Sequence, residues 1–342
     1  METWASRDGD AIVTRDNFVF YVFGYEHPEG RVFSFLKYVP SDLRPYFQVR
    51  FLKRHWKLKD VELLRPEKLY TPQSFHRFLE TFRKHLPLYV YSCPLRGKEL
   101  LSVPLGLIRK VYVPSECLQT LLRKKRKDRL EKLALKLAAF LSEESGVPLE
   151  DFGIHGSIAL GMHDAKSDID LSVYGSHNFR NLEKTIETLV DDGALTYICS
   201  NRLDEVRKHR GQYKGYRFAY NAVRKVEEMV ARYGGNRYSP VRLITFSCEV
   251  VNDNESMFRP ATYQIKDYQP LTPPSQLPEE EKPTKIVSMI GCYRNVVKRG
   301  ERAKVSGMLE RIENIETGEI GYQIVVGTGT CEDEYIWRFD AG

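Results

Sequence analysis

The sequence predicts an α/β protein of the α+β kind, with an N-terminal α+β domain, a central mixed core and a small C-terminal β-barrel. Three observations lead to this fold class. An aromatic, β-branched hairpin lies near the N-terminus, a long helical stripe precedes an alternating strand in the middle, and short strands separated by turns follow at the end. Because 342 residues exceed the size of one ordinary hydrophobic core, two or three domains are expected.

The composition is that of a folded, soluble and highly charged protein, with 42% hydrophobic and 29% charged residues. The net charge of +6 permits an anionic partner without requiring one. No apolar run approaches the roughly 18 residues of a membrane-spanning helix, and the first residues lack the apolar segment of a signal peptide. The six cysteines are scattered and form no CxxC pair, which argues against a zinc site and a disulfide framework. We therefore expect a cytoplasmic protein with no membrane partner.

Residues 1–113 are expected to form the N-terminal domain, without a catalytic constellation of their own. Residues 18–25 (FVFYVFGY) and 31–38 (RVFSFLKY) predict two strands joined by a turn at 27–30. The aromatic residues of this hairpin favour core packing over base stacking. The spacing of apolar residues over 71–85 predicts a helix.

Residues 44–59 (RPYFQVRFLKRHWKLK) interleave six Lys and Arg with four aromatic residues. Such a pattern suits a groove for single-stranded nucleic acid, in which cations meet phosphates and rings stack on bases. A solvated, amphipathic edge uses the same residues and is the favoured alternative.

A long amphipathic helix is expected from Pro114 to about Glu144, since leucine and alanine recur along one face. Residues 123–127 (RKKRK) lie on its outer side, where they either contact phosphates or form a solvated face. Gly146 is expected to end the helix in the left-handed conformation.

The stretch 153–175 (GIHGSIALGMHDAKSDIDLSVYG) carries the candidate chemistry. Residues 168–173 alternate between polar and apolar types, so Asp168 and Asp170 should lie on one face of a strand. Two adjacent carboxylates repel each other unless a cation lies between them, and oxygen ligands suit Mg²⁺. The nearby histidines, His155, His163 and His209, are expected to be structural.

Gly156-Ser157 followed by Asp168-Ile169-Asp170 resembles the hG[GS]…Dh[DE]h motif of the DNA polymerase β-like nucleotidyltransferase superfamily. The same stretch, together with residues 23–40 (FGYEHPEGRVFSFLKYVP), looks like an archaeal group of predicted nucleotidyltransferases. The resemblance implies a nucleotidyltransferase core over residues 114–268. In that core Gly156 and Ser157 would hold the phosphates of a nucleotide, and the two aspartates would hold two Mg²⁺ ions, or Mn²⁺ in their place.

The resemblance also implies a third acidic residue on a later strand, as a metal ligand and catalytic group. Residues 242–251 (RLITFSCEVV) predict the next convincing strand, with Glu249 on its polar face. Glu249 is therefore the expected third acid, and Asp253 is the alternative. The long interval after Asp170 departs from the motif and suggests an inserted subdomain.

The expected insertion, residues 202–242, contains eleven Lys and Arg against four Asp and Glu. Positive charge beside a metal–triphosphate site stabilises the substrate and the leaving pyrophosphate. Lys208, Arg210 and Lys214 are the expected nucleotide contacts, with a solvated basic loop as the alternative. A helix is expected to follow over residues 220–230.

Residues 269–284 (QPLTPPSQLPEEEKPT) predict an extended linker rich in proline and glutamate. Four short strands are expected within residues 285–342, at 285–293, 303–312, 321–326 and 334–339, and their spacing suggests the small barrel. Such barrels often bind RNA, but the fold alone does not give a function.

The sequence thus predicts a Mg²⁺-dependent, nucleotide-binding enzyme that transfers a nucleoside monophosphate from an NTP, such as ATP, to a hydroxyl acceptor and releases pyrophosphate. The basic and barrel segments favour RNA, of a tRNA-like kind, as the acceptor. A small-molecule or protein hydroxyl is one alternative. The other is a catalytically silent RNA-binding module of the same fold.

Overall fold

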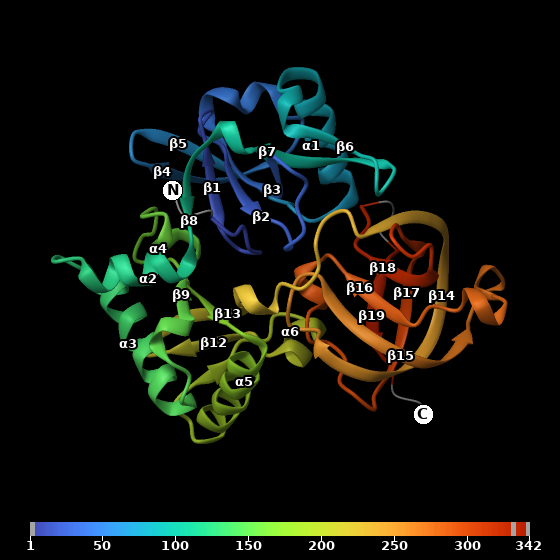
Figure 1. Ribbon diagram of the computed structural model, residues 1–342. Helices are drawn as coiled ribbons and strands as arrows, with labels where there is room; N and C mark the ends of the chain where they lie inside the picture. The colour runs from blue at the N-terminus through green and yellow to red at the C-terminus, as the bar shows by residue number, and fades with distance from the viewer. Residues whose placement is uncertain (1–3, 330–332, 340–342) are drawn as a thin grey trace.

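The computed structural model describes residues 4–329 and 333–339, which form a mixed α+β structure with three β-sheets (Figure 1). The N-terminal unit lies at the top of Figure 1, the central unit at the lower left and the C-terminal unit at the right. Within these residues, no helix is long and apolar enough to span a membrane.

The N-terminal unit is an eight-stranded sheet with one α-helix. Its main path runs β4-β5-β3-β2-β1-β8, and β7 pairs with β3 and β6. The strands are β1 (Ala11–Thr14), β2 (Val19–Val22), β3 (Arg31–Pro40), β4 (Phe51–Leu58), β5 (Val61–Pro66), β6 (Val90–Cys93), β7 (Lys98–Pro104) and β8 (Ile108–Tyr112). The predicted hairpin is confirmed as the antiparallel pair β2 and β3. The predicted helix is α1 (Pro72–His85), which begins at an N-cap where Thr71 accepts from the backbone of Ser74.

The two faces of this sheet pack against different partners because side chains alternate along a strand. Phe18, Phe20 and Val22 pack in a cluster with residues of α1. Val19 and Tyr21 point the other way and share a cluster with Leu160 and Met162 of the central unit. The aromatic hairpin is therefore core, as expected. In the basic stretch 44–59, Phe47 and Trp56 are likewise buried.

The predicted helix from 114 to 144 is wrong in one respect, since it is two helices, α2 (Pro114–Arg123) and α3 (Arg129–Ser145). Asp128 caps α3 in a reciprocal capping box with Glu131. This signature, an aspartate three residues before a glutamate, is present in the sequence and explains the break. Gly146 ends α3 with φ of 68°, as predicted.

The central unit is a five-stranded sheet in the order β11-β12-β13-β10-β9. Its elements are β9 (Phe152–Ile154), α4 (Gly156–Ala159), β10 (Ile169–Tyr174), α5 (Ser176–Asp191), β11 (Thr196–Tyr197), α6 (Arg202–Arg207), β12 (Arg210–Tyr213) and β13 (Tyr216–Val223). β10 runs parallel to β13 and antiparallel to β9. Residues 210–213 and 216–223 of the expected insertion thus belong to the central sheet, and its residues from 236 onward belong to the C-terminal sheet. Residues 220–223, predicted to be helical, belong to β13, where Phe218, Tyr220 and Ala222 alternate into the core.

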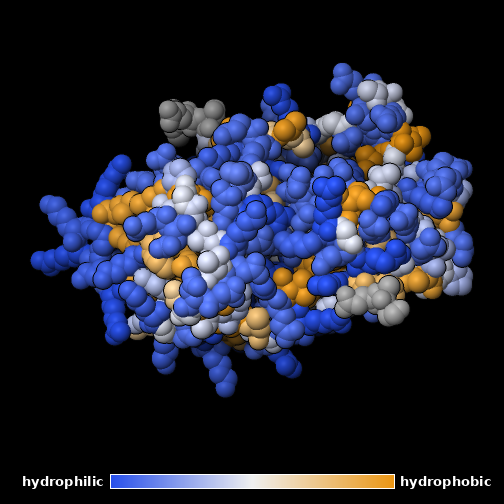
Figure 2. Space-filling model, turned by 90° about the horizontal axis from the view of Figure 1, so that it is seen from below, coloured by the Kyte–Doolittle hydropathy of each residue, from blue (hydrophilic) through white to orange (hydrophobic). Residues whose placement is uncertain are grey.

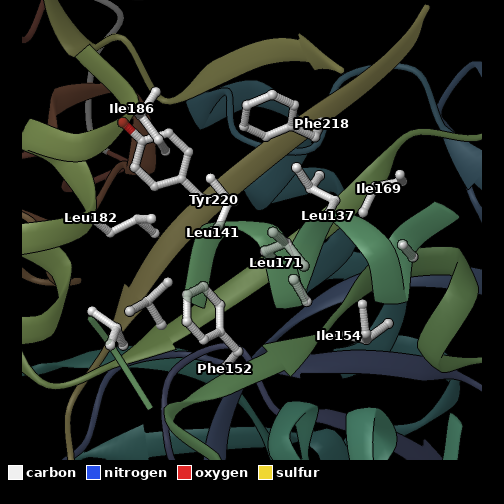
Figure 3. Close-up of a cluster of buried hydrophobic side chains, with 14 of the residues drawn as sticks. Leu137, Leu141, Phe152, Ile154, Ile169, Leu171, Leu182, Ile186, Phe218 and Tyr220 are labelled. Carbon is white, nitrogen blue, oxygen red and sulfur yellow. The ribbon is translucent and has the colours of Figure 1, made fainter. Parts of the chain in front are cut away.

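One face of the central sheet carries the hydrophobic core. Figure 3 shows leucine and isoleucine side chains of α3 and α5 near apolar and aromatic side chains of β9, β10 and β13. The labelled residues are Leu137, Leu141, Phe152, Ile154, Ile169, Leu171, Leu182, Ile186, Phe218 and Tyr220. Because side chains alternate along β10, Asp170 and Ser172 lie on the opposite face from Leu171. On that face, Asp170 lies near Lys37 and Arg65 of the N-terminal unit.

The C-terminal unit is a six-stranded sheet whose strand order is β14-β15-β16-β18-β17-β19. The strands are β14 (Asn236–Glu255), β15 (Ala261–Pro270), β16 (Lys285–Ser288), β17 (Arg302–Asn314), β18 (Ile320–Val326) and β19 (Tyr335–Arg338). β14 also pairs with β17. The four strands predicted after residue 285 are confirmed, but the first covers only 285–288 of the predicted 285–293. The surface seen from below is mostly hydrophilic, with apolar residues in scattered patches (Figure 2).

The sheet boundaries differ from the expected domain boundaries. β14 and β15 were assigned to the catalytic core, but they pair with strands of the C-terminal sheet. Gln269 and Pro270 of the expected linker belong to β15, and residues 271–284 connect β15 to β16 within one sheet. The face of β14 was predicted correctly, since Ile244, Phe246, Cys248 and Val250 are all buried.

Candidate functional site

Asp170 and the Gly156-Ser157 turn lie against each other. β9 leads into the turn and pairs with β10, and the backbone N–H of His155 donates to the carbonyl of Asp170 at 2.8 Å. A Cβ atom at Gly156 would lie 2.0 Å from Oδ2 of Asp170. Gly156 also has φ of +65°, which disfavours other residues. The turn and the carboxylate that the sequence singled out are therefore in direct contact.

Asp168 lies immediately before β10 and is exposed, whereas Asp170 is half-buried. Nε of Arg217 on β13 forms an ion pair with Oδ1 of Asp168 at 2.8 Å. Burial raises the pKa of Asp170 to about 6; Lys37 opposes this shift, Asp168 adds to it, and Arg65 and Arg210 oppose it. The two carboxylates thus interact, and each also faces cationic side chains.

The N-terminal sheet supplies part of this cationic environment. Lys37 lies on β3 and Arg65 on β5, and burial lowers the pKa of Lys37. Nζ of Lys37 donates to the hydroxyl of Tyr70 at 3.4 Å. Nε of Arg65 is buried without a hydrogen-bond partner among the described atoms. The acid pair consequently faces a basic surface that comes from a different unit of the chain.

A second contact from the N-terminal unit holds the loop that precedes Asp168. Arg54 on β4 forms an ion pair with Asp164 at 3.0 Å, and its guanidinium donates to Ser167 at 3.3 Å. Tyr21 packs on the ring of His155, with 4.7 Å between ring centroids. The turn and the loop that carry the motif are therefore both fixed by the N-terminal sheet.

Of the three predicted basic contacts, only Arg210 is shown near the acid pair, where its charge lowers the pKa of Asp170. Lys208 follows α6 and forms an ion pair with Glu187 at 2.6 Å. Lys214 lies in the β12–β13 turn, over the ring of Tyr213. Neither of these two lysines has a described contact with an aspartate of the pair. Arg217, which the sequence did not single out, does.

Glu249 is not brought to the acid pair. It lies on β14 of the C-terminal sheet, opposite Arg302 and Lys266, and pairs with Lys266 at 3.2 Å. The alternative, Asp253, accepts from Arg180 at 3.1 Å. Neither carboxylate has a described contact with Asp168 or Asp170.

Strand β13, which runs parallel to β10, offers no replacement for the third acid. β13 has the sequence YRFAYNAV and carries no carboxylate. Ala219 lies opposite Asp170 in the register, and Arg217 stands two residues before it, next to Asp168. The arrangement is therefore two carboxylates flanked by an arginine.

The histidines near the motif have structural surroundings. Burial lowers the pKa of His155 to about 3, and Lys37, Arg259 and Arg294 lower it further. Burial likewise lowers the pKa of His209, which lies 3.4 Å from the amide of Asn295.

Asp128, Glu131 and His163 form a separate group that can hold a metal ion, with ligand atoms within 4.8 Å of one another. Sequence reasoning missed this group because His163 is distant in the chain. Nε2 of His163 lies 2.7 Å from Asp128, and Glu131 pairs with Lys124 at 2.5 Å. Both carboxylates also take part in the capping box of α3.

Comparison with known proteins finds an archaeal protein that is similar to this chain over nearly its full length. The chain is 25% identical to the protein named "Uncharacterized protein MJ1086" of Methanocaldococcus jannaschii, over 96% of this chain and 97% of that protein. No model of a protein family matches the chain. No solved structure matches it either.

Proposed function

We propose that this chain is a Mg²⁺-dependent nucleotidyltransferase that transfers a nucleoside monophosphate from an NTP to a hydroxyl group and releases pyrophosphate. The observation that carries the proposal is the contact between Gly156 and the carboxylate of Asp170. It joins a glycine-serine turn, which can bind phosphates through backbone N–H groups and a hydroxyl, to a pair of carboxylates.

The residues present fit a divalent cation. The charge of Asp168 raises the pKa of Asp170, so a cation between the two carboxylates would relieve their repulsion. Asp168 and Asp170 would hold Mg²⁺, which commonly takes its other ligands from waters and substrate phosphates. When bound, Mg²⁺ would polarise the phosphoryl group that is transferred. The site we propose has two protein carboxylates, without Glu249.

The cations around the pair would bind the triphosphate. Lys37 and Arg65 face the acids from the N-terminal sheet, and Arg210 and Arg217 flank them within the central sheet. Fixed positive charge at this place stabilises negative charge that develops on the leaving pyrophosphate. In this arrangement the N-terminal unit completes the nucleotide site.

The strand pairing is compatible with the finer fold that we propose. The parallel pair β10 and β13 with antiparallel β9 would be the nucleotidyltransferase core. In the C-terminal unit, β14 pairs with both β15 and β17, and β16 and β18 connect these two, which supports a small barrel. RNA is the acceptor class that we favour, and small-molecule and protein hydroxyls are the alternatives.

Labelled NTPs test the proposal directly. We expect the wild-type protein with Mg²⁺ to transfer label from an α-labelled NTP to a component of total cellular RNA. Asp168→Asn and Asp170→Asn should each reduce the transfer by at least about 100-fold, a typical loss for a group that stabilises the transition state. Asp192→Asn is the matched control, since Asp192 is exposed at the end of α5. Equal transfer by the wild type and both site variants would refute the assignment of the acid pair.

A catalytically silent nucleotide- or RNA-binding protein is the second candidate. The ion pair between Arg217 and Asp168 favours this candidate, because Arg217 binds a carboxylate that would otherwise be free to coordinate a metal ion. The label-transfer assay separates the two candidates, and Arg217→Ala shows which role Arg217 has. If Arg217 binds phosphate, the substitution weakens NTP binding by roughly 10-fold while Mg²⁺ alone binds more tightly. If Arg217 only blocks the pair, both affinities rise.

A further inference from the structure

A surface cavity of about 500 Å³ lies between the C-terminal sheet and α6, and neither Asp168 nor Asp170 lines it. Six described residues line it: Arg202, Lys304, Tyr335, Trp337, Arg338 and Phe339. Three of them are aromatic, three are cationic and none is acidic. The volume is within the range of about 300 to 1,000 Å³ that small ligands occupy.

The alternation along β19 explains why the ring of Trp337 lines the cavity instead of the core. Ile336 is fully buried within the hydrophobic cluster of the C-terminal unit. Its neighbours in the strand, Tyr335 and Trp337, are only partly buried. Tyr335 still packs against that cluster, whereas Trp337 is not among the described residues that do. Phe339 is 39% exposed. Apolar packing thus accounts for Ile336 and for part of Tyr335, but it does not explain the ring of Trp337.

The cations approach the rings from three elements. Lys304 lies opposite Trp337 in the pairing of β17 with β19, so both residues share one face. The guanidinium of Arg202, at the start of α6, lies over the ring of Trp337 at 5.5 Å. Arg338 pairs with Glu301 at 3.2 Å. The neighbouring acid on β14, Glu249, pairs with Lys266, so the positive charge at the cavity is not cancelled by it.

We propose that this cavity binds a single-stranded nucleic acid, with a base stacked on Trp337 and a phosphate held by Lys304 and Arg202. Aromatic faces accept any base, while cations track the phosphate backbone, and together these features mark single-stranded binding surfaces. A duplex hides the faces of its bases within the stack, so it cannot use the rings. This proposal does not rest on the proposed nucleotidyl transfer.

Anisotropy of fluorescein-labelled oligonucleotides tests this site. The probes are oligouridine, oligothymidine and an RNA duplex of the same length, each titrated with the full-length protein at several salt concentrations. Both single strands should bind more tightly than the duplex. Trp337→Ala should weaken single-strand binding by roughly 5- to 150-fold, the loss that accompanies removal of one base–aromatic stack. Trp337→Phe should retain most of the affinity because it keeps a ring.

Lys304→Ala should reduce the slope of log affinity against log salt by about 0.7, the value for one phosphate contact on a single strand. Lys53→Ala is the matched control, since Lys53 is an exposed lysine on β4 in the other basic and aromatic segment. Thermal melting of each variant shows that it is folded.

Three results would overturn the proposal: no binding of any single strand, equal affinity for the duplex, or a loss with Lys53→Ala that exceeds the loss with Lys304→Ala. Asp168→Asn and Asp170→Asn should bind oligonucleotides as the wild type does. Failure of nucleotidyl transfer therefore leaves this result unaffected, and the two proposals can fail separately.

Discussion

The carboxylate of Asp170 occupies the space that a side chain at position 156 would need. An ideal Cβ at Gly156 would be 2.0 Å from Oδ2 of Asp170, well inside van der Waals contact. This contact joins the two halves of the motif, which are separated by a loop in the sequence. It also suggests a pair of substitutions that distinguish backbone strain from damage to the site.

Gly156→Ala should displace Asp170 and disrupt the acid pair. Gly161→Ala is the matched control, because Gly161 has nearly the same φ, +66°, with nothing within 4 Å of its Cβ position. In both variants the free energy of unfolding should fall by about 1 kcal/mol, because alanine is strained in the left-handed conformation. Only Gly156→Ala should lose Mg²⁺-dependent nucleotide binding. Calorimetric titration with Mg²⁺ and NTP measures the difference. Equal loss in both variants would show that the contact with Asp170 has no role in binding.

The stability of the protein should depend on the ionisation of Asp170. Its pKa is about 6 in the folded protein, above the value of about 3.9 in an unfolded chain. Between these values the folded state binds more protons than the unfolded state, so the contribution of Asp170 to the free energy of unfolding falls as pH rises. Asp170→Asn removes this dependence.

The measurement is the free energy of unfolding of both proteins across this pH window, without divalent cations. Relative to the wild type, Asp170→Asn should gain stability from about pH 4 to about pH 6 and then level off. Adding Mg²⁺ above pH 6 should stabilise the wild type and leave the variant unchanged. A constant difference across the window would contradict the raised pKa.

The group formed by Asp128, Glu131 and His163 allows a third test. We expect its main role to be the capping of α3, because both carboxylates already accept hydrogen bonds at the helix start. Asp128→Ala should lower the free energy of unfolding by about 1 kcal/mol, and Asp128→Ser should recover most of the loss. Chemical denaturation with and without EDTA measures both effects. A large loss of wild-type stability in EDTA that Asp128→Ser abolishes would instead identify a structural metal.

The sequence was sufficient where local pattern decides the structure. The hairpin of β2 and β3, the helix α1, the left-handed Gly146 and the buried face of β14 all follow from alternation, helical spacing or cap chemistry. The break between α2 and α3 was missed although its capping box is visible, because the leucine stripe continues across it. β13 was mistaken for a helix at its end, since valines at 223, 226 and 230 also fit helical spacing.

Long-range pairing could not be predicted from these patterns. β14 was expected beside Asp170, but it pairs with β17, far along the chain. Lys37 and Arg65 lie close enough to lower the pKa of Asp170 only because the N-terminal sheet packs against the motif. No periodicity in their strands indicates that packing. The same limit explains why Arg217 was not preferred over Lys208 and Lys214.

Helix α6 lies between the central and C-terminal units (Figure 1), so it connects the surroundings of the two proposed sites. Arg202 at its first residue covers Trp337, and Arg210, three residues beyond its last, acts on the charge of Asp170. A short helix and three further residues keep these two Cα atoms within about 20 Å. Any energetic coupling between the two sites would therefore have a short path through α6. By linkage, whatever factor the nucleic acid imposes on Mg²⁺ affinity, Mg²⁺ must impose on nucleic-acid affinity.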